Sequence, residues 1–234
     1  MQTEQSSHSA MKWLGAATGL TAAAYATYAG VTWLCYGHAR FLSRKGTDRL
    51  LDVFMPNYDV VERHSVAVEA PAETTLQAAA EMDLGKSLPV RAIFKGRELL
   101  LGSKPDSVVR PRGALALMKS IGWGVLAELP GREIVLGGVT KPWEPNPAFR
   151  AVPPDEFAKF NEPGYVKIVF TLRADGAGEG HSIFRTETRA IATDPISRNK
   201  FRRYWTLLSP GIITIRRFML STVKREAARR FAAA

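Results

Sequence analysis

The chain has 234 residues, 46% of them apolar, which is enough for one ordinary domain plus an additional segment and argues against global disorder. Its single cysteine, Cys35, excludes an internal disulfide framework and a cysteine-based zinc cage, and its four histidines show no short metal-ligand spacing. We therefore expect no metal site. Without a phosphate-binding loop or a dinucleotide fingerprint, we also expect no cofactor.

The formal net charge of +10 is concentrated near the C-terminus. Between Pro195 and Ala234, ten lysines and arginines stand against Glu226 alone, which is a net charge of +9. Such a basic segment suits nucleic acid, anionic lipid headgroups or simply a solvated helix face. No helix-turn-helix, zinc-finger or RNP-like motif accompanies it, so we do not expect nucleic acid as a partner, and anionic headgroups are the better candidate.

The N-terminal part of the chain reads as a membrane anchor. Residues 1–12 are short and polar and are predicted to form a disordered tail, and residues 13–37 are predicted to form a transmembrane helix. The second segment contains no charged residue, and a spanning helix needs about 20 apolar residues. Trp33 and Tyr36 lie at its far end, where interfacial aromatic residues belong. A cleaved signal peptide is the alternative, because Lys12 can serve as a basic leader and small residues offer cleavage sites.

The charges around this segment predict its orientation. Only Lys12 precedes it, whereas four basic residues follow it: Arg40, Arg44, Lys45 and Arg49. By the positive-inside rule we expect a single-pass membrane protein whose C-terminal domain lies in the cytoplasm. Residues 38–57 are predicted to form a basic amphipathic connector near the membrane surface.

Residues 58–234 alternate between strand and helix patterns and are predicted to form one domain. Tyr58–Glu69 alternates apolar and polar residues as a first strand does. The clearest strand, Gly164–Ala174, is joined by a glycine-rich loop to an antiparallel partner, His181–Thr193. The intervening predictions are helices over 71–84 and 89–101, a loop over 103–113, strands over 124–129 and 133–139, and a helical turn over 154–161. Residues 114–121 are predicted to form either a short helical turn or the run into the next strand.

The last segment, Pro195–Arg230, is predicted to form one long amphipathic helix. Asp194 suits its N-cap, and Pro195 suits its first position. Pro210 and Gly211 interrupt the pattern, so we expect a kink or a short break there. Because propensity alone does not stabilise so long a helix in water, its apolar stripe must pack on the strands. Most arginines lie off this stripe, which consists of Phe201, Trp205, Leu208, Ile212, Ile215, Met219 and Thr222.

Three segments carry a resemblance to a known superfamily: ERHSVAVEAPAETTLQAAAEMDL, VKIVFTLRADGAGEGHSIFRTETRAIATD and FRRYWTLLSPGIITIRRFML. From Tyr58 to Arg230 the chain resembles the SRPBCC, or START-like, superfamily, which includes the birch-pollen allergen family and polyketide cyclases. The resemblance implies an α+β helix-grip fold, in which a curved antiparallel sheet wraps around the long C-terminal helix. It concerns architecture, because the superfamily has no universal catalytic motif, and the predicted transmembrane helix departs from its common soluble members.

Members of that superfamily leave a cavity between the sheet and the last helix, and the resemblance implies a cavity here. Apolar walls with a few polar groups suit a lipid-like or aromatic small molecule. The same side chains can instead fill a closed core. The ligand-binding residues that the resemblance implies are Val166, Ile168, Phe170, Leu172, Phe184, Thr186, Thr188, Trp205, Leu208, Ile212 and Ile215.

No nucleophile elbow, phosphate loop or metal cluster appears, so the sequence leaves any catalytic residues unknown. Glu62 and His64 share a strand face with apolar residues, so either side chain can point inward and act as a general acid or base. His181 shares a face with charged residues and is expected to face solvent, together with Glu187 and Arg189.

The leading hypothesis is a membrane-anchored binding module for a hydrophobic small molecule or lipid. The alternatives are a cyclase- or hydratase-type enzyme that uses the same cavity, and a structural or interaction protein with a closed core.

Overall fold

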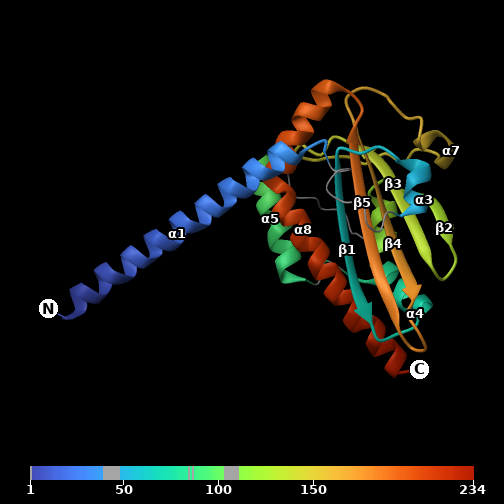
Figure 1. Ribbon diagram of the computed structural model, residues 1–234, viewed down its shortest axis with the longest axis horizontal. Coiled ribbons are helices and arrows are strands. Elements are labelled where there is room, and N and C mark those ends of the chain that lie inside the picture. The colour runs from blue at the N-terminus through green and yellow to red at the C-terminus, as the bar shows by residue number, and fades with distance from the viewer. Residues whose placement is uncertain (1, 39–47, 84, 86, 103–110) are drawn as a thin grey trace.

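The computed structural model of the chain describes residues 2–38, 48–83, 85, 87–102 and 111–234. Five strands within these residues form one antiparallel sheet in the order β1-β5-β4-β3-β2. Helix α8 (Pro195–Ala232) lies along one face of this sheet (Figure 1). This α+β arrangement fits the predicted helix-grip fold. The strands are β1 (Val60–Val68), β2 (Gly124–Leu129), β3 (Glu133–Thr140), β4 (Val166–Gly176) and β5 (Ser182–Ala192).

The helices and strands predicted beyond residue 58 are confirmed, with ends that differ by a few residues. Pro71 precedes α4 as its N-cap, and Gly102 ends α5 in the left-handed conformation that glycine adopts without strain. Residues 39–47 of the predicted connector and 103–110 of the predicted loop lie outside the described residues. The remaining helices are α1 (Gln2–Cys35), α3 (Arg49–Phe54), α4 (Ala72–Glu81), α5 (Leu88–Leu101), α6 (Ala114–Ser120) and α7 (Pro154–Phe157).

Strands β4 and β5 form the centre of the sheet and pair along their whole length as a hairpin. The loop between them contains Gly178 and Gly180, whose φ angles of 112° and 65° are open to glycine at no steric cost. Strand β5 also pairs with β1, so the first strand of the sheet lies beside the last.

Helix α8 begins as predicted. The Asp194 carboxylate accepts hydrogen bonds from the backbone N–H groups of Ile196 and Ser197, each at 2.9 Å, and Pro195 occupies the first turn. The helix continues through Pro210 without a break, and Figure 1 shows that it bends along its length.

The predicted transmembrane helix is wrong, and so are the membrane localisation and the orientation that depended on it. Helix α1 is long, but among the described residues no helix is both long and apolar enough to cross a membrane. The cause is composition, because alanine, glycine, threonine and tyrosine fill most of the uncharged segment. Helix α1 also begins at Gln2, within the residues predicted as a disordered tail. Large aliphatic side chains occur in the segment only at Leu14, Leu20, Val31 and Leu34.

The second half of α1 packs on α8, while its first half projects away from the sheet (Figure 1). The Tyr25 hydroxyl donates to the carbonyl oxygen of Leu207 at 2.7 Å. The Arg202 guanidinium donates to the carbonyl oxygen of Trp33 and lies 4.0 Å from the centre of the Trp33 indole. These contacts attach α1 to the side of α8 that faces away from the sheet.

Helix α3 covers part of the opposite face of the sheet. The fully buried Arg189 guanidinium donates there to Glu187 at 2.7 Å, to Asp52 at 2.6 Å and to the Met55 carbonyl oxygen at 2.8 Å. Arg63 donates to both oxygens of Glu187, each at 2.8 Å. The expectation that Glu187 and Arg189 face solvent is therefore wrong, because strand alternation shows which residues share a face and not what covers that face.

A substitution at Trp205 tests whether α8 packs against the sheet as part of the hydrophobic core. Its side chain is 9% exposed and lies 6.0 Å from Phe201 between ring centres. We expect Trp205→Ala to lower the free energy of unfolding by roughly 3–5 kcal/mol, because the change removes a large buried side chain. Arg203→Ala, on the exposed side of the same helix, should change it by about 0.5 kcal/mol or less. Denaturant unfolding measures both, and equal losses would contradict the packing of α8 on the sheet.

Candidate functional site

The face of the sheet that α8 covers, here called the inner face, carries two apolar clusters. Half-buried Ile168 of β4 packs against both of them and so lies at their junction. We call them the Trp205 cluster and the Phe170 cluster. The Trp205 cluster contains Tyr36, Val60, Val166, Ala190, Phe201 and Trp205. The Phe170 cluster is larger and includes Val68, Leu136, Phe170, Phe184, Met219 and Val223.

Between the two clusters lies a middle belt, defined as Ile168, Thr188 and Ile212. All three residues are half-buried. By contrast, the neighbours of Ile168 on the same face of β4 are closed off, since Val166 is 0% and Phe170 is 4% exposed. Along β4, the centre of the inner face is therefore more open to solvent than the positions on either side of it.

Polar side chains enter the inner face beside this belt. In the register of β1 and β5, Glu62 lies opposite Thr188 and His64 lies opposite Thr186. Directly paired residues point to the same face, so all four share the inner face with Phe170, the partner of Thr188 on β4. His64 Nε2 lies 3.4 Å from Glu62 Oε2 without the alignment of a hydrogen bond. In the described part of the chain, His64 Nε2 and Thr188 Oγ1 are buried atoms without a hydrogen-bond partner.

Arg216 of α8 completes this group. Its Nη1 donates to Thr186 Oγ1 at 3.1 Å, and its guanidinium carbon lies 5.0 Å from the centre of the Phe170 ring. The residue as a whole is half-buried, but its guanidinium lies inside the protein. Burial lowers the pKa of Arg216 to about 10, although the Glu62 carboxylate acts at longer range in the opposite direction and raises it. The inner polar cluster is therefore defined as Glu62, His64, Thr186, Thr188 and Arg216.

The sequence analysis missed Arg216 because it assigned the inward position to its apolar neighbour Ile215. The helix period of 3.6 residues, traced back three turns from buried Ala227, returns to position 216. The burial of Ala227 is known only from the structure, so the apolar pattern of the sequence selected Ile215.

The predicted ligand-binding residues differ in exposure, and their role stays a prediction. His181, expected on the surface, is exposed. The buried members of the predicted set are Val166, Phe170, Leu172, Phe184, Thr186 and Trp205, and the half-buried members are Ile168, Thr188, Leu208, Ile212 and Ile215.

A second group of charged residues lies around the start of α3, on the opposite face. The Asp48 carboxylate accepts from the backbone N–H groups of Leu50 at 2.9 Å and Leu51 at 3.2 Å, which caps α3. Arg173 donates to the same carboxylate at 3.2 Å. Asp48, Leu50, Arg173 and Glu133 are among the residues that line a hollow of about 540 Å³. The hollow therefore lies between α3 and the sheet, away from α8.

Glu133 and Asp48 behave as a carboxyl pair in this hollow. Burial, and then the neighbouring Asp48, raise the pKa of Glu133 to about 7, although Thr171 donates a hydrogen bond to it at 2.7 Å. Burial opposes the ionisation of Asp48, but hydrogen bonds from Glu133, from the start of α3 and from Arg173 hold its pKa below the ordinary value. Glu133 therefore keeps its proton well above the usual range for a carboxyl group.

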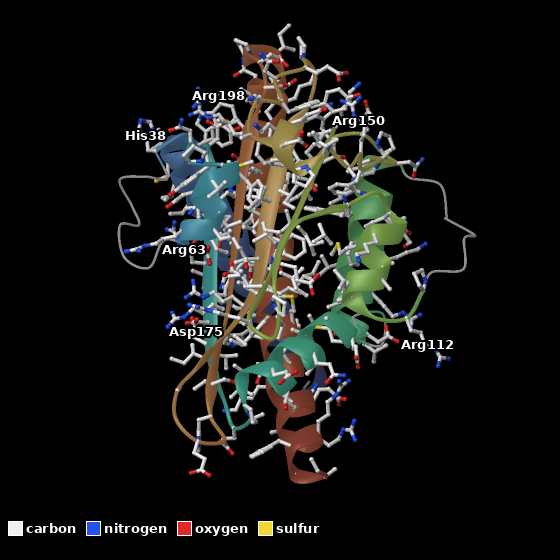
Figure 2. All side chains as sticks on the ribbon, turned by 90° about the vertical axis from the view of Figure 1, so that its right-hand side faces the viewer. His38, Arg63, Arg112, Arg150, Asp175 and Arg198 are labelled. Atoms are coloured by element: carbon white, nitrogen blue, oxygen red, sulfur yellow. The ribbon has the colours of Figure 1, made fainter. Side chains whose placement is uncertain are left out.

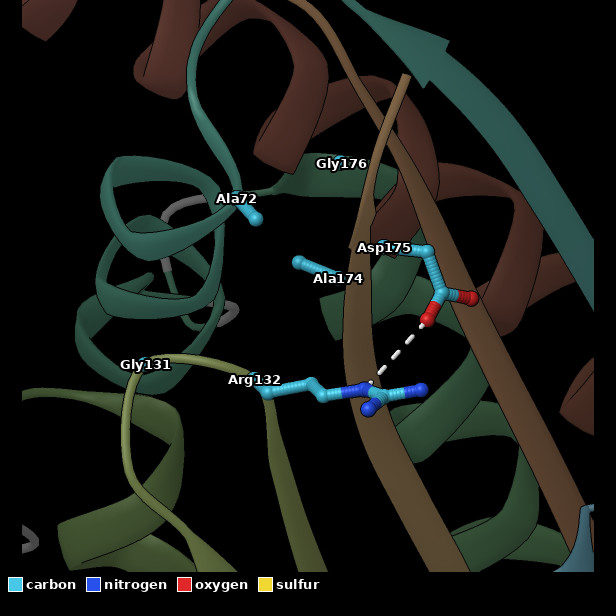
Figure 3. Close-up of a pocket in the computed structure, with 6 residues that line it drawn as sticks. All are labelled: Ala72, Gly131, Arg132, Ala174, Asp175 and Gly176. Carbon is cyan, nitrogen blue, oxygen red and sulfur yellow. Dashed lines mark ion pairs between the residues drawn. The ribbon is translucent and has the colours of Figure 1, made fainter. Parts of the chain in front are cut away.

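A smaller hollow of about 390 Å³ lies at the end of β4. Its wall is formed largely by backbone and alanine, and its charged members Arg132 and Asp175 lie 3.7 Å apart as an ion pair (Figure 3). Figure 2 shows Asp175 along the same edge of the molecule as Arg63, with Arg112 at the opposite edge. Neither hollow lies between the sheet and α8.

Within the described ranges, no three His, Cys, Asp or Glu side chains are grouped to hold a metal ion.

Comparison with known proteins finds only distant likeness. No family model and no curated protein matches the chain. Among solved structures, protein CV1439 from Chromobacterium violaceum has 15% identity and a TM-score of 0.32, with 73% of this chain and 99% of that chain covered. CalU16 from Micromonospora echinospora has 12% identity and a TM-score of 0.25, with 74% and 97% covered.

The Zhui aromatase/cyclase from Streptomyces sp. R1128 also has 12% identity and a TM-score of 0.25, with 73% of this chain and 94% of that chain covered. Likeness at this level assigns no family, ligand or reaction. The fold description depends on this chain's own strand order and on the position of α8.

The raised pKa of Glu133 predicts how the stability of the protein depends on pH. The folded protein holds this proton up to about pH 7, whereas the unfolded chain releases it near 4.5, so the folded state binds more protons between these values. The free energy of unfolding should therefore fall as pH rises from 4.5 to 7, by at most about 1.4 kcal/mol per pH unit. Glu133→Gln should flatten this slope in urea unfolding measured across the range. The lowered pKa of Asp48 acts in the opposite direction and only at more acidic pH. An unchanged slope in the variant would contradict the assignment.

Proposed function

We propose that the protein binds a hydrophobic small molecule, aromatic or lipid-like, on the inner face between the sheet and α8. The observation that carries the proposal is the middle belt, where the centre of a largely apolar face stays half-exposed between two clusters that exclude water. A ligand lying over Ile168 and Ile212 would remove this apolar surface from water, at about 25 cal/mol per Å² covered.

The surroundings of the belt support a ligand site of this class. Val166 of β4 and Trp205 of α8 border it on one side, and Phe170 of β4 borders it on the other. A few polar groups stand beside these apolar walls, which is the usual composition of a small-molecule site. The hollows at Glu133 and Asp175 suit a hydrophobic molecule less well, because charged side chains and backbone form much of their walls.

A neutral apolar probe tests the proposal. We expect N-phenyl-1-naphthylamine to bind the purified protein with a rise in probe fluorescence. Ile168→Trp should weaken this binding by about tenfold or more, because the larger side chain fills the half-open centre of the inner face. Its melting temperature should stay close to that of the unchanged protein, since the position is not closed off.

Ile183→Trp is the matched control. Ile183 is also half-buried, but it belongs to the alternate set of β5 residues that point away from α8. This variant should bind the probe as the unchanged protein does. A protein that never binds the probe would instead support a closed core whose function lies on its surface.

A second candidate function is an enzyme of the cyclase or hydratase type that uses the same site. The inner polar cluster favours it, because His64 and Glu62 lie together beside a buried guanidinium. In such a reaction a base removes the proton from a carbon next to a carbonyl group, and the electron pair moves onto the carbonyl oxygen. In this proposal His64 would take the proton. Glu62 would orient the imidazole or balance its charge, and Arg216 would stabilise the enolate oxygen.

Proton exchange measures this chemistry without knowledge of the natural substrate. The test compound is 2-tetralone, an apolar ketone, whose α-protons exchange with deuterium from D₂O as followed by proton NMR. If the cluster is catalytic, the protein accelerates exchange and His64→Gln reduces the acceleration by about 10²-fold. His181→Gln, which changes a solvent-exposed histidine, should leave the rate unchanged. A bound ketone that exchanges no faster than in buffer would leave binding as the function.

A further inference from the structure

The charge of Arg216 has no acidic partner, which is unusual for a guanidinium inside a protein. Within the described part of the chain, no carboxylate lies within ion-pair distance, and the contacts of Arg216 are one hydroxyl and one aromatic ring. A buried charge without a counter-charge is destabilising, and proteins ordinarily pair it or leave it in water. Glu62 acts on Arg216 only at longer range, so the described protein places no counter-charge in contact with the guanidinium.

The comparison with Arg189 shows that this is not a general property of the fold. Arg189 is fully buried on the other face of the same sheet, and it contacts the carboxylates of Glu187 at 2.7 Å and Asp52 at 2.6 Å. Among the described residues, the chain thus places carboxylates in contact with Arg189 and none in contact with Arg216.

Among the described residues, two of the buried polar atoms that lack a hydrogen-bond partner lie around the Arg216 guanidinium. Arg216 reaches Thr186 on β5 and Phe170 on β4. Thr188 adjoins both, because it is two residues from Thr186 on the same strand face and directly opposite Phe170. His64 on β1 lies directly opposite Thr186, so it flanks the contact between Thr186 and Arg216 from the side away from β4. Buried Thr188 Oγ1 and His64 Nε2 are both left without hydrogen bonds there.

We propose that the ligand of the inner face carries an anionic oxygen group, such as a carboxylate, which binds the Arg216 guanidinium and accepts a hydrogen bond from Thr188. This inference rests on the proposed function, and it narrows the ligand class from hydrophobic molecules to amphipathic acids. An anionic oxygen forms charge-assisted hydrogen bonds with a guanidinium and supplies the missing counter-charge. The apolar part of the same molecule covers Ile168 and Ile212 of the middle belt.

A pair of probes that differ only in charge tests the inference. We compare 2-naphthoate with the neutral 2-naphthalenemethanol by isothermal titration calorimetry at pH 7. The unchanged protein should bind naphthoate at least about tenfold more tightly than the alcohol, which corresponds to about 1.4 kcal/mol. Arg216→Met should abolish this preference while changing the affinity for the alcohol less than twofold. Arg216→Lys keeps the charge without the planar fork and should retain part of the preference.

Arg217→Met is the matched control, because Arg217 adjoins Arg216 on α8 and is exposed. It should retain the full preference for naphthoate. Replacing an unpaired buried arginine with methionine should not unfold the protein, and the thermal transition of each variant verifies this.

The outcomes separate the inference from the proposed function. If the unchanged protein binds both probes equally, the inference fails and the binding function stands. If neither probe binds, the proposed function itself fails, and the inference fails with it. If Arg217→Met removes the preference as much as Arg216→Met does, the general field of the basic helix attracts the anion, and the specific role of Arg216 is overturned.

Discussion

Strand β5 carries the contacts on which the other layers of the molecule depend. It pairs with β1 on one side and β4 on the other, so it holds the sheet together across its middle. Its outward side chains Glu187 and Arg189 fasten α3 through ion pairs and carbonyl contacts. Its inward Thr186 meets Arg216 of α8. Because alternate residues of a strand point to opposite faces, a shift of one position in β5 would exchange the two sets and break both layers at once.

The two arginines differ in the partners that the fold supplies for them. Arg189 is fully compensated by acids and by backbone carbonyls, and removing one partner would leave a buried charge unpaired. Arg216 has only a hydroxyl and an aromatic ring, so the fold gains little from it, and an apolar residue of similar length would serve the core as well. A side chain that the fold does not need for its stability is better explained by what it binds.

Local patterns were sufficient to predict most of the fold, but not the contacts that depend on three dimensions. The alternation in β4 and β5 and the Asp194–Pro195 start of α8 predicted these elements, because both signals lie within a few neighbouring residues. The failures have other causes. Residues 13–37 lack charge without being strongly apolar, and the cover over Arg189 comes from α3, far away in sequence. Arg216 lay within one position of the predicted stripe, where a rule that prefers apolar residues selects Ile215 and passes over the arginine.

The inner face is graded in polarity across the sheet, and this gradient sets how an amphipathic ligand would lie. One row of directly paired residues runs from Glu62 on β1 through Thr188 on β5 and Phe170 on β4 to Leu136 on β3. The side chains along this row change from a carboxylate to a hydroxyl group, then to an aromatic ring and finally to an aliphatic group. A ligand whose anionic end lies over β5 and whose apolar body extends toward β3 pairs the charge of Arg216 and covers apolar surface at the same time. The reverse orientation would press a charged group against Leu136 and leave the guanidinium facing hydrocarbon, and each of these costs several kcal/mol in order of magnitude. The inner face would therefore select the direction of the proposed ligand as well as its class, and the polar end of the bound molecule would lie beside His64.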